Sequence, residues 1–391
     1  MYLFLLTLWR SLLLAAHALA APFEQHRRLG GALLIILGLP VFLAWQALNW
    51  LGLLLDEVFF RGYRNVEVHQ PLFVIGPPRT GTTHLHHVLS TNPETTTFRT
   101  WECLFGLSIS GRYACLGLGK LHRALGSPLA RLGGWLGQRL VGRLDDIHPI
   151  RMRDPEEDFL ALMPPLACFL IVVPLPKARW LWRLARFDTD IHGAERRALL
   201  THYRQAIQKH LYVFGDGKTF LSKNASFAGM TQSLLEEFPD ARIIATVRDP
   251  RSVVPSQLSA LRPALELCGF RGYPDYLRDD FLHLLEHYFM NLARTAASRP
   301  GRIAFIENSE LRHELLPSLE RAFGELSMPF PVALRDGARE MSGSTGAKAS
   351  AHRYTLEEFG LDEAAIQSRF ATVYTSFEFG RARPAAVQES H

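Results

Sequence analysis

The stretch VIGPPRTGTTHLHHVL, from Val74 to Leu89, predicts a strand, a glycine-bounded loop and a helix in direct succession. Gly76 and Gly81 are spaced as in the phosphate-binding pattern G-x-x-x-x-G-K-[ST]. The lysine position of that pattern holds Thr82, and the only cation within the loop is Arg79. The stretch therefore predicts a phosphate-binding turn without the lysine on which nucleotide triphosphatases depend.

The chain around this turn alternates between short strands and longer helices. The apolar run 71–75 precedes the loop, and RIIATV (242–247) and RIAFI (302–306) predict two further strands. Helical patterns over 194–214 and 279–298 lie between these strands. Because such alternation is typical of a mostly parallel sheet covered on both faces, we expect an α/β fold with a P-loop-type sheet flanked by helices.

The turn has the donors that a phosphate-like anion needs. A strand–loop–helix turn directs backbone N–H groups at one point, with the helix dipole behind them. Gly81 allows close approach of the backbone, and Thr82 and Thr83 add hydroxyl donors. No Walker-B-type acid is evident, since ATVRDP places an arginine before Asp249. A donor with a single bridging group at its 5′ end would need neither magnesium nor the missing lysine.

Two motifs together resemble a known family. PRTGTT resembles the 5′-phosphosulfate loop of sulfotransferases, which use 3′-phosphoadenosine-5′-phosphosulfate (PAPS). In IIATVRDPRSVVPSQLSAL, Arg248 at a strand end and Ser256 on the next helix resemble the 3′-phosphate site of that family. An arginine offers forked donors to a phosphate dianion. The resemblance implies that PAPS is bound by Pro78, Arg79, Thr80, Gly81, Thr82, Thr83, Arg248 and Ser256.

A third motif supplies a lysine. In FLSKNASFAGMTQSLLEEFPDARIIATVRDP, Lys223 takes the place of the lysine that the family carries at a strand end. The chain departs from the family in the next two residues, where Asn224 and Ala225 replace the usual Ser-Pro or Asp-Pro. The resemblance spans residues 71–380 and is closest to a bacterial group that shares motifs with tyrosylprotein sulfotransferases. It implies in-line sulfuryl transfer, with Arg79 and Lys223 stabilising the developing charge.

The acceptor hydroxyl needs a general base, and the leading candidate is Glu102 in FRTWECLF, which resembles the catalytic carboxylate of the family. Its apolar neighbours Trp101 and Phe105 could raise its pKa toward the working range. Lys348 and Arg353 are expected to close over the nucleotide from the C-terminal side. Three histidines and an acidic cluster are rival bases or acceptor-site residues, with a further histidine near the cluster: His84, His86, His87, Glu156, Glu157, Asp158 and His148.

The N-terminal segment differs from the rest of the chain. Residues 29–55 carry no charge and are long enough to cross a bilayer, and residues 2–20 are apolar apart from Arg10 and His17. A cleaved signal peptide is one alternative, although a basic n-region is lacking. Flanking arginines would place the catalytic part outside a bacterial cell, where nucleotide donors are scarce. A buried helical pair is another alternative. We expect membrane association, with the catalytic domain in the cytosol.

The composition of the chain limits the classes of partner that it is expected to bind. The chain has 391 residues, a net charge of +5 and no Lys/Arg block, so no nucleic-acid partner is expected. Four scattered cysteines without a CxxC pair predict neither a zinc site nor a disulfide framework. His84, His86 and His87 do not predict a metal site, because residues two apart on a helix do not share a face. We expect an apolar membrane-associating segment (1–65), a sulfotransferase domain (66–380) and a flexible tail (381–391).

The hypothesis is therefore a membrane-associated, PAPS-dependent sulfotransferase. The expected position of the enzyme at a membrane suggests a lipid or lipid-linked hydroxyl as acceptor. Two alternatives are a P-loop kinase or nucleotide triphosphatase, which the missing lysine disfavours, and a catalytically inactive member of the fold used for membrane docking. Intact Arg79, Lys223, Arg248 and Ser256 disfavour the inactive alternative.

Overall fold

The computed structural model describes residues 2–124, 152, 154–215, 217–344 and 355–379. His148, Lys348 and Arg353, to which the sequence analysis gave roles, lie outside the described residues, as does the tail 381–391.

A five-stranded parallel sheet forms the centre of the molecule, in the order β2-β3-β1-β4-β5. Its strands are β1 (Leu72–Ile75), β2 (Thr95–Thr96), β3 (Thr219–Lys223), β4 (Arg242–Val247) and β5 (Ile303–Glu307). The three strands predicted from apolar runs are confirmed. The two-residue strand β2 was not predicted, because it is too short and polar to give a pattern.

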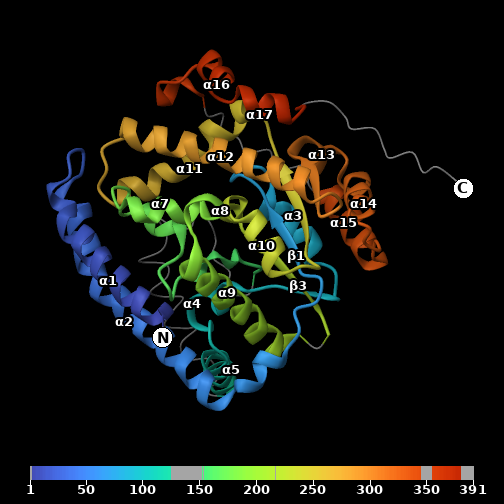
Figure 1. The fold of residues 1–391 in the computed structure, drawn as a ribbon, viewed down its shortest axis with the longest axis horizontal. Helices are drawn as coiled ribbons and strands as arrows, with labels where there is room; N and C mark the ends of the chain where they lie inside the picture. The colour runs from blue at the N-terminus through green and yellow to red at the C-terminus, as the bar shows by residue number, and fades with distance from the viewer. Residues whose placement is uncertain (1, 125–151, 153, 216, 345–354, 380–391) are drawn as a thin grey trace, which may run out of the picture.

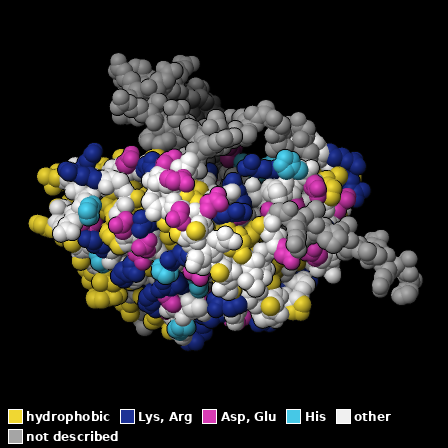
Figure 2. Space-filling model, turned by 90° about the horizontal axis from the view of Figure 1, so that it is seen from above, with side chains coloured by type: hydrophobic (Ala, Val, Ile, Leu, Met, Phe, Trp, Pro, Cys, Tyr) yellow, Lys and Arg dark blue, Asp and Glu magenta, His cyan; other side chains and the backbone are white. Residues whose placement is uncertain are grey.

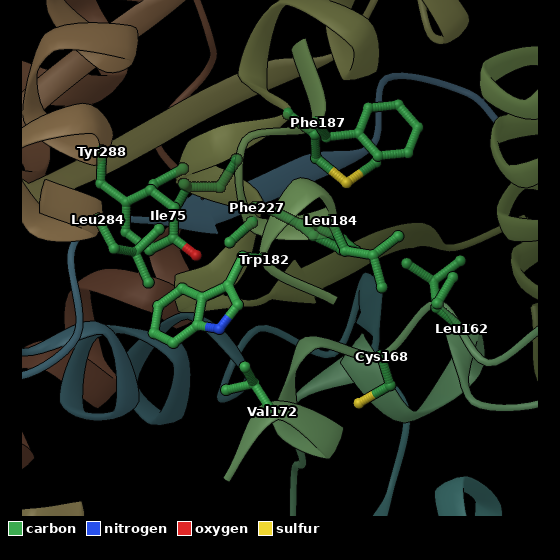
Figure 3. Close-up of a cluster of buried hydrophobic side chains, with 14 of the residues drawn as sticks. Ile75, Leu162, Cys168, Val172, Trp182, Leu184, Phe187, Phe227, Leu284 and Tyr288 are labelled. Carbon is green, nitrogen blue, oxygen red and sulfur yellow. The ribbon is translucent and has the colours of Figure 1, made fainter. Parts of the chain in front are cut away.

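Alternate residues of β1 face two separate cores. Phe73 and Ile75 join a core on one face, and Leu72 and Val74 join a core on the other. The first core is covered by α7 (Arg179–Ala185), α8 (Phe187–Asp190), α9 (Gly193–Phe214), α10 (Thr231–Glu237), α11 (Pro250–Leu267), α12 (Asp275–Ser298), α16 (Glu363–Arg369) and α17 (Ala371–Ser376). The second is covered by α3 (Thr82–Leu89), α13 (Asn308–His313), α14 (Leu315–Glu325) and α15 (Val332–Ser344). Figure 3 shows part of the first core, where side chains of β1, α7 and α12 come together.

Two apolar helices, α1 (Tyr2–Ala20) and α2 (Leu29–Phe59), lie side by side along one side of the domain (Figure 1). Buried polar side chains hold this hairpin in place. Arg10 donates to the carbonyl oxygen of Pro165 (2.9 Å), and its other terminal nitrogen pairs with Glu195 (2.6 Å). The Gln46 amide donates to the carbonyl oxygen of Met163 at 2.6 Å.

Both ends of α2 are attached to the domain. At the start, the Arg28 N–H donates to the carbonyl oxygen of Gly269 (2.6 Å). Near the end, the buried Asp56 carboxylate accepts the N–H groups that open α5 (Ile109–Ala124), each at 2.8 Å, and pairs with Lys209 at 3.0 Å. The helix therefore runs along the surface of the domain over its whole length.

The outer face of the hairpin is apolar and exposed. Both helices are long and apolar enough to cross a membrane, judged by length and composition. Figure 2 shows hydrophobic side chains gathered along the left edge of the molecule, the side on which α1 and α2 lie in Figure 1. The exposed residues include Leu5, Leu8, Trp9 and Leu12 of α1, and Leu34, Leu37, Val41, Leu48, Leu51, Leu54 and Val58 of α2.

Candidate active site

The turn after β1 is tied to the neighbouring strand β4. A Cβ atom on Gly76 would lie 2.4 Å from the carbonyl oxygen of Thr246, so only glycine fits this approach. The buried Thr80 hydroxyl lies 2.6 Å from the Thr246 hydroxyl. Gly81 has a φ of 105° and Arg79 a φ of 69°, so the turn contains two left-handed residues. Thr80 therefore secures the loop with its side chain, which leaves its backbone N–H as the group it can offer to a ligand.

Three arginines lie close together beside this turn: Arg79, Arg248 and Arg312. Arg79 Nε donates to Ser256 Oγ at 3.0 Å, and Arg248 Nη1 donates to the carbonyl oxygen of Arg79 at 3.3 Å. Burial, together with the positive charges of Arg312 and Arg79, lowers the pKa of Arg248. Within the described residues none of the three guanidinium groups pairs with a carboxylate. Such a cluster of like charges is suited to bind an anion.

A cavity of about 620 Å³ opens at the carboxyl edge of the sheet. It is lined by Thr82 and Thr83 of the turn and by residues that follow β3, β4 and β5, among them Asn224, Arg248 and Arg312. Its lining also includes apolar side chains, among them Phe159, Phe169, Leu261, Phe281 and Leu284. The cavity adjoins β1, where the strand order reverses, which is the usual ligand position in open parallel sheets.

Three polar atoms along this cavity have no hydrogen-bond partner within the described residues: His84 Nε2, Asn224 Nδ2 and the Tyr288 hydroxyl. Asn224 is fully buried and Tyr288 is 2% exposed, so water does not freely solvate them. Burial without a partner costs about 1–3 kcal/mol for each group. These atoms are therefore suited to bind a ligand that enters the cavity.

Lys223 and Glu157 form an ion pair at the cavity wall. Lys223 stands at the end of β3, and Glu157 is the member of the acidic cluster that lines the cavity. The other two members are engaged elsewhere. Glu156 accepts the Thr100 hydroxyl at 3.0 Å. Asp158 accepts the Tyr203 hydroxyl, and its burial raises its pKa to about 7.

Glu102 lies outside the cavity, in α4 (Thr100–Phe105). Its carboxylate is 1% exposed and accepts Arg112 Nε at 3.0 Å and His210 Nδ1 at 2.8 Å. A second oxygen accepts the Arg99 N–H at 3.1 Å. Burial alone would raise the pKa of Glu102, but His210 and Arg112 together lower it to about 2. Arg79, Arg248 and Ser256 thus contact one another, and Lys223 pairs with Glu157 of the cavity wall. Glu102 does not line this cavity, and its role as the base stays a prediction.

Arg312, Tyr288 and Asn308 were not predicted from the sequence as site residues. Asn308 Nδ2 donates to the carbonyl oxygen of Thr80 at 2.9 Å and so supports the turn. Arg312 and Asn308 lie on α13, directly after the predicted third strand, and a search for polar residues after every strand would have found them. Tyr288 lies in the middle of the amphipathic helix α12, where its hydroxyl gives no sequence signal.

The residues that the structure describes contain no group of three or more His, Cys, Asp or Glu side chains placed to hold a metal ion. Of the three histidines on α3, His86 is buried and contacts Thr97 Oγ1 at 2.9 Å. Its pKa is lowered well below the usual value by burial, then by Lys223.

The fold of the chain is similar to that of two sulfotransferases of known structure. The chain is similar to the crystal structure of sulfotransferase STF9 from Mycobacterium avium, with 18% identity and a TM-score of 0.69 over 92% of this chain and 88% of that chain. Sulfotransferase STF1 from Mycobacterium tuberculosis H37Rv is similar at 16% identity and a TM-score of 0.67, over 91% and 90%. No curated protein matches the chain by sequence. A model described as the sulfotransferase family matches residues 71–331.

Proposed function

Because the chain belongs to the sulfotransferase family and is a PAPS-dependent enzyme, we propose that the cavity at the carboxyl edge of its sheet binds PAPS and an acceptor hydroxyl. The observation that supports this most directly is the cluster of Arg79, Arg248 and Arg312 beside a phosphate-binding turn. The unpartnered donors of Asn224 and Tyr288 complete a pocket suited to a multiply anionic nucleotide.

The two ends of the donor have separate sets of ligands. The backbone N–H groups of the turn 78–83 and the Thr82 and Thr83 hydroxyls bind the 5′-phosphosulfate. Arg248 and Ser256 bind the 3′-phosphate. Arg79 connects the two sets, because its guanidinium contacts Ser256 while its backbone belongs to the turn.

Sulfuryl transfer then needs one base and one cation, and Glu157 and Lys223 supply them. The donor provides a sulfuryl group whose bond to the 5′-phosphate oxygen breaks as the acceptor oxygen bonds to sulfur. Glu157 takes the proton of the acceptor hydroxyl, and the electron pair of the broken bond remains on the phosphate. Lys223, released from Glu157, donates to that leaving oxygen and stabilises its charge.

The donor site can be tested with adenosine 3′,5′-bisphosphate, the product that transfer leaves behind. At a concentration of 100 Kd it should stabilise the detergent-solubilised protein by about 2.7 kcal/mol, which raises the melting temperature by several degrees. The Arg248→Ala variant should lose about 1.5–3 kcal/mol of binding free energy. The matched control is Arg251→Ala, because Arg251 is exposed and pairs with Asp249 outside the cavity. Stabilisation by ATP with magnesium alone would contradict the proposal.

We further propose that the hairpin of α1 and α2 lies in one leaflet of a membrane, with the catalytic domain on the cytosolic side. A helix attached to the domain at Arg28, Gln46 and Asp56 cannot cross a bilayer while the domain stays in water. Its exposed apolar outer face is suited to lie within the interface instead. An enzyme held at this surface would meet lipid or lipid-linked hydroxyls, which we propose as its acceptors.

Vesicle binding tests this mode of association. Replacing Leu37 and Leu48 by glutamate removes two exposed side chains from the outer face. Each such side chain contributes about 1.5–3 kcal/mol when it leaves water, so binding to phosphatidylcholine vesicles, measured by co-flotation, should weaken by about 10²–10⁴-fold. Val332→Glu is the control, since Val332 is 74% exposed on α15, away from the hairpin (Figure 1). Equal flotation of all three proteins would exclude the interfacial hairpin.

A further inference from the structure

An apolar groove of about 290 Å³ lies between the helical hairpin and the catalytic domain. The hairpin contributes Leu14, Ile35 and Phe42 to its wall, and the domain contributes Ile171 and Leu175. Every residue that lines the groove is apolar or glycine. A Cβ atom on Gly38 of α2, which also lines it, would meet nothing within 4 Å. The groove is therefore open space with an apolar lining on the inner face of the hairpin.

One short segment separates this groove from the active-site cavity. The turn η4 (Phe169–Val172) directs Phe169 and Val172 to the cavity and Ile171 to the groove. Leu170 lines both. It is 46% exposed although Ile171 and Val172 beside it are buried. The groove and the cavity thus lie next to each other and share Leu170 as a lining residue.

The groove and the active-site cavity together have an apolar end and a polar end, as an amphiphilic molecule does. The end formed by the groove is apolar, and Phe169 and Val172 of the neighbouring cavity are apolar as well. The polar end is at Glu157, paired with Lys223, where the proposed transfer takes place. A molecule with a hydroxyl at one end and a long hydrocarbon chain at the other matches this order of surfaces.

We propose that the groove holds the hydrocarbon chain of the acceptor, which passes Leu170 and presents its hydroxyl to Glu157. This inference rests on the proposed function and adds to it the class of substrate: a long-chain alcohol or a lipid with a hydroxyl at the head of its chain. The hairpin then has two roles. Its outer face holds the enzyme in the membrane, and its inner face forms one wall of the acceptor site.

Photo-cross-linking tests the occupant directly. The probe is 1-hexadecanol with a diazirine in mid-chain, added to the full chain in phosphatidylcholine vesicles, with adducts mapped by mass spectrometry. Adducts are expected on residues that line the groove, such as Ile35, Leu39, Phe42, Met163 and Leu175. Gly38→Phe fills the groove and should lower this labelling at least about tenfold. Gly30→Phe is the matched control, because Gly30 is on the same helix, also has free space around its Cβ position and does not line the groove.

Three outcomes would overturn the proposal. Labelling confined to outer-face residues such as Leu37 and Val41, or unchanged in Gly38→Phe, would show that the chain does not occupy the groove. Equal labelling by the methyl ether of the probe would show that the groove takes any lipid chain, without selection for the acceptor hydroxyl. Stabilisation by adenosine 3′,5′-bisphosphate, measured on the same samples, reports separately on the proposed function: its presence without groove labelling would reject only the acceptor route.

Discussion

Replacing Glu157 by glutamine is expected to lower kcat by about 10²–10⁴-fold, the usual contribution of a positioned general base. The carboxylate lines the cavity and is held by Lys223, and an amide of the same shape cannot take the proton of the acceptor hydroxyl. Bisphosphate binding should remain, because the proposed anion site consists of Arg79, Arg248 and Ser256, which contact one another. Single-turnover transfer from PAPS, together with the melting-temperature shift, measures both properties.

The neighbouring Glu156 provides the matched control. Its carboxylate accepts the Thr100 hydroxyl and the N–H of Glu157, and it does not line the cavity. Glu156→Gln should therefore keep kcat within a few-fold of the unmodified enzyme. If Glu157→Gln retains full activity, the base is another group, and His84, with its unpartnered Nε2 in the cavity, becomes the next candidate.

Replacing Glu102 by glutamine should have the opposite pattern, with a large loss of stability and little loss of transfer rate in the molecules that remain folded. The carboxylate compensates the buried charge of Arg112, and breaking a buried pair costs about 3–5 kcal/mol. Denaturant unfolding and kcat per folded molecule measure the two effects. Glu340→Gln, at an exposed position of α15, should change the free energy of unfolding by less than about 0.5 kcal/mol.

The lowered pKa of Glu102 predicts that the free energy of unfolding depends on pH. Its pKa is lowered from 4.5 to about 2 in the folded protein. A lowered pKa means that its contribution is fully present above pH 4.5 and is lost as the pH falls toward 2. The Glu102→Gln variant should lack this part of the acid dependence. Loss of transfer in a variant that stays folded would instead identify Glu102 as the base and contradict the assignment of Glu157.

The position of Glu102 shows where sequence reasoning reaches its limit. Trp101 and Phe105 suggested an apolar setting that raises the pKa of the carboxylate, and burial does act in that direction. The sequence could not show that His210, from a helix more than a hundred residues later, and Arg112 would both contact it. Those two contacts lower the pKa and place the carboxylate in a structural network.

The strand–turn–helix from Val74 to Leu89 and the apolar runs of β4 and β5 determined the α/β fold by themselves. Local patterns suffice there because strand periodicity, glycine and helix starts depend on near neighbours in the chain. The carboxyl edge of a parallel sheet places whatever follows each strand at one site, which agrees with the grouping of Arg79, Lys223 and Arg248 that the resemblance to sulfotransferases implied. Only the tertiary structure decided which carboxylate faces the cavity, which donors lack partners, and that the apolar hairpin packs along the domain. Those properties depend on contacts between distant segments, and no local pattern encodes them.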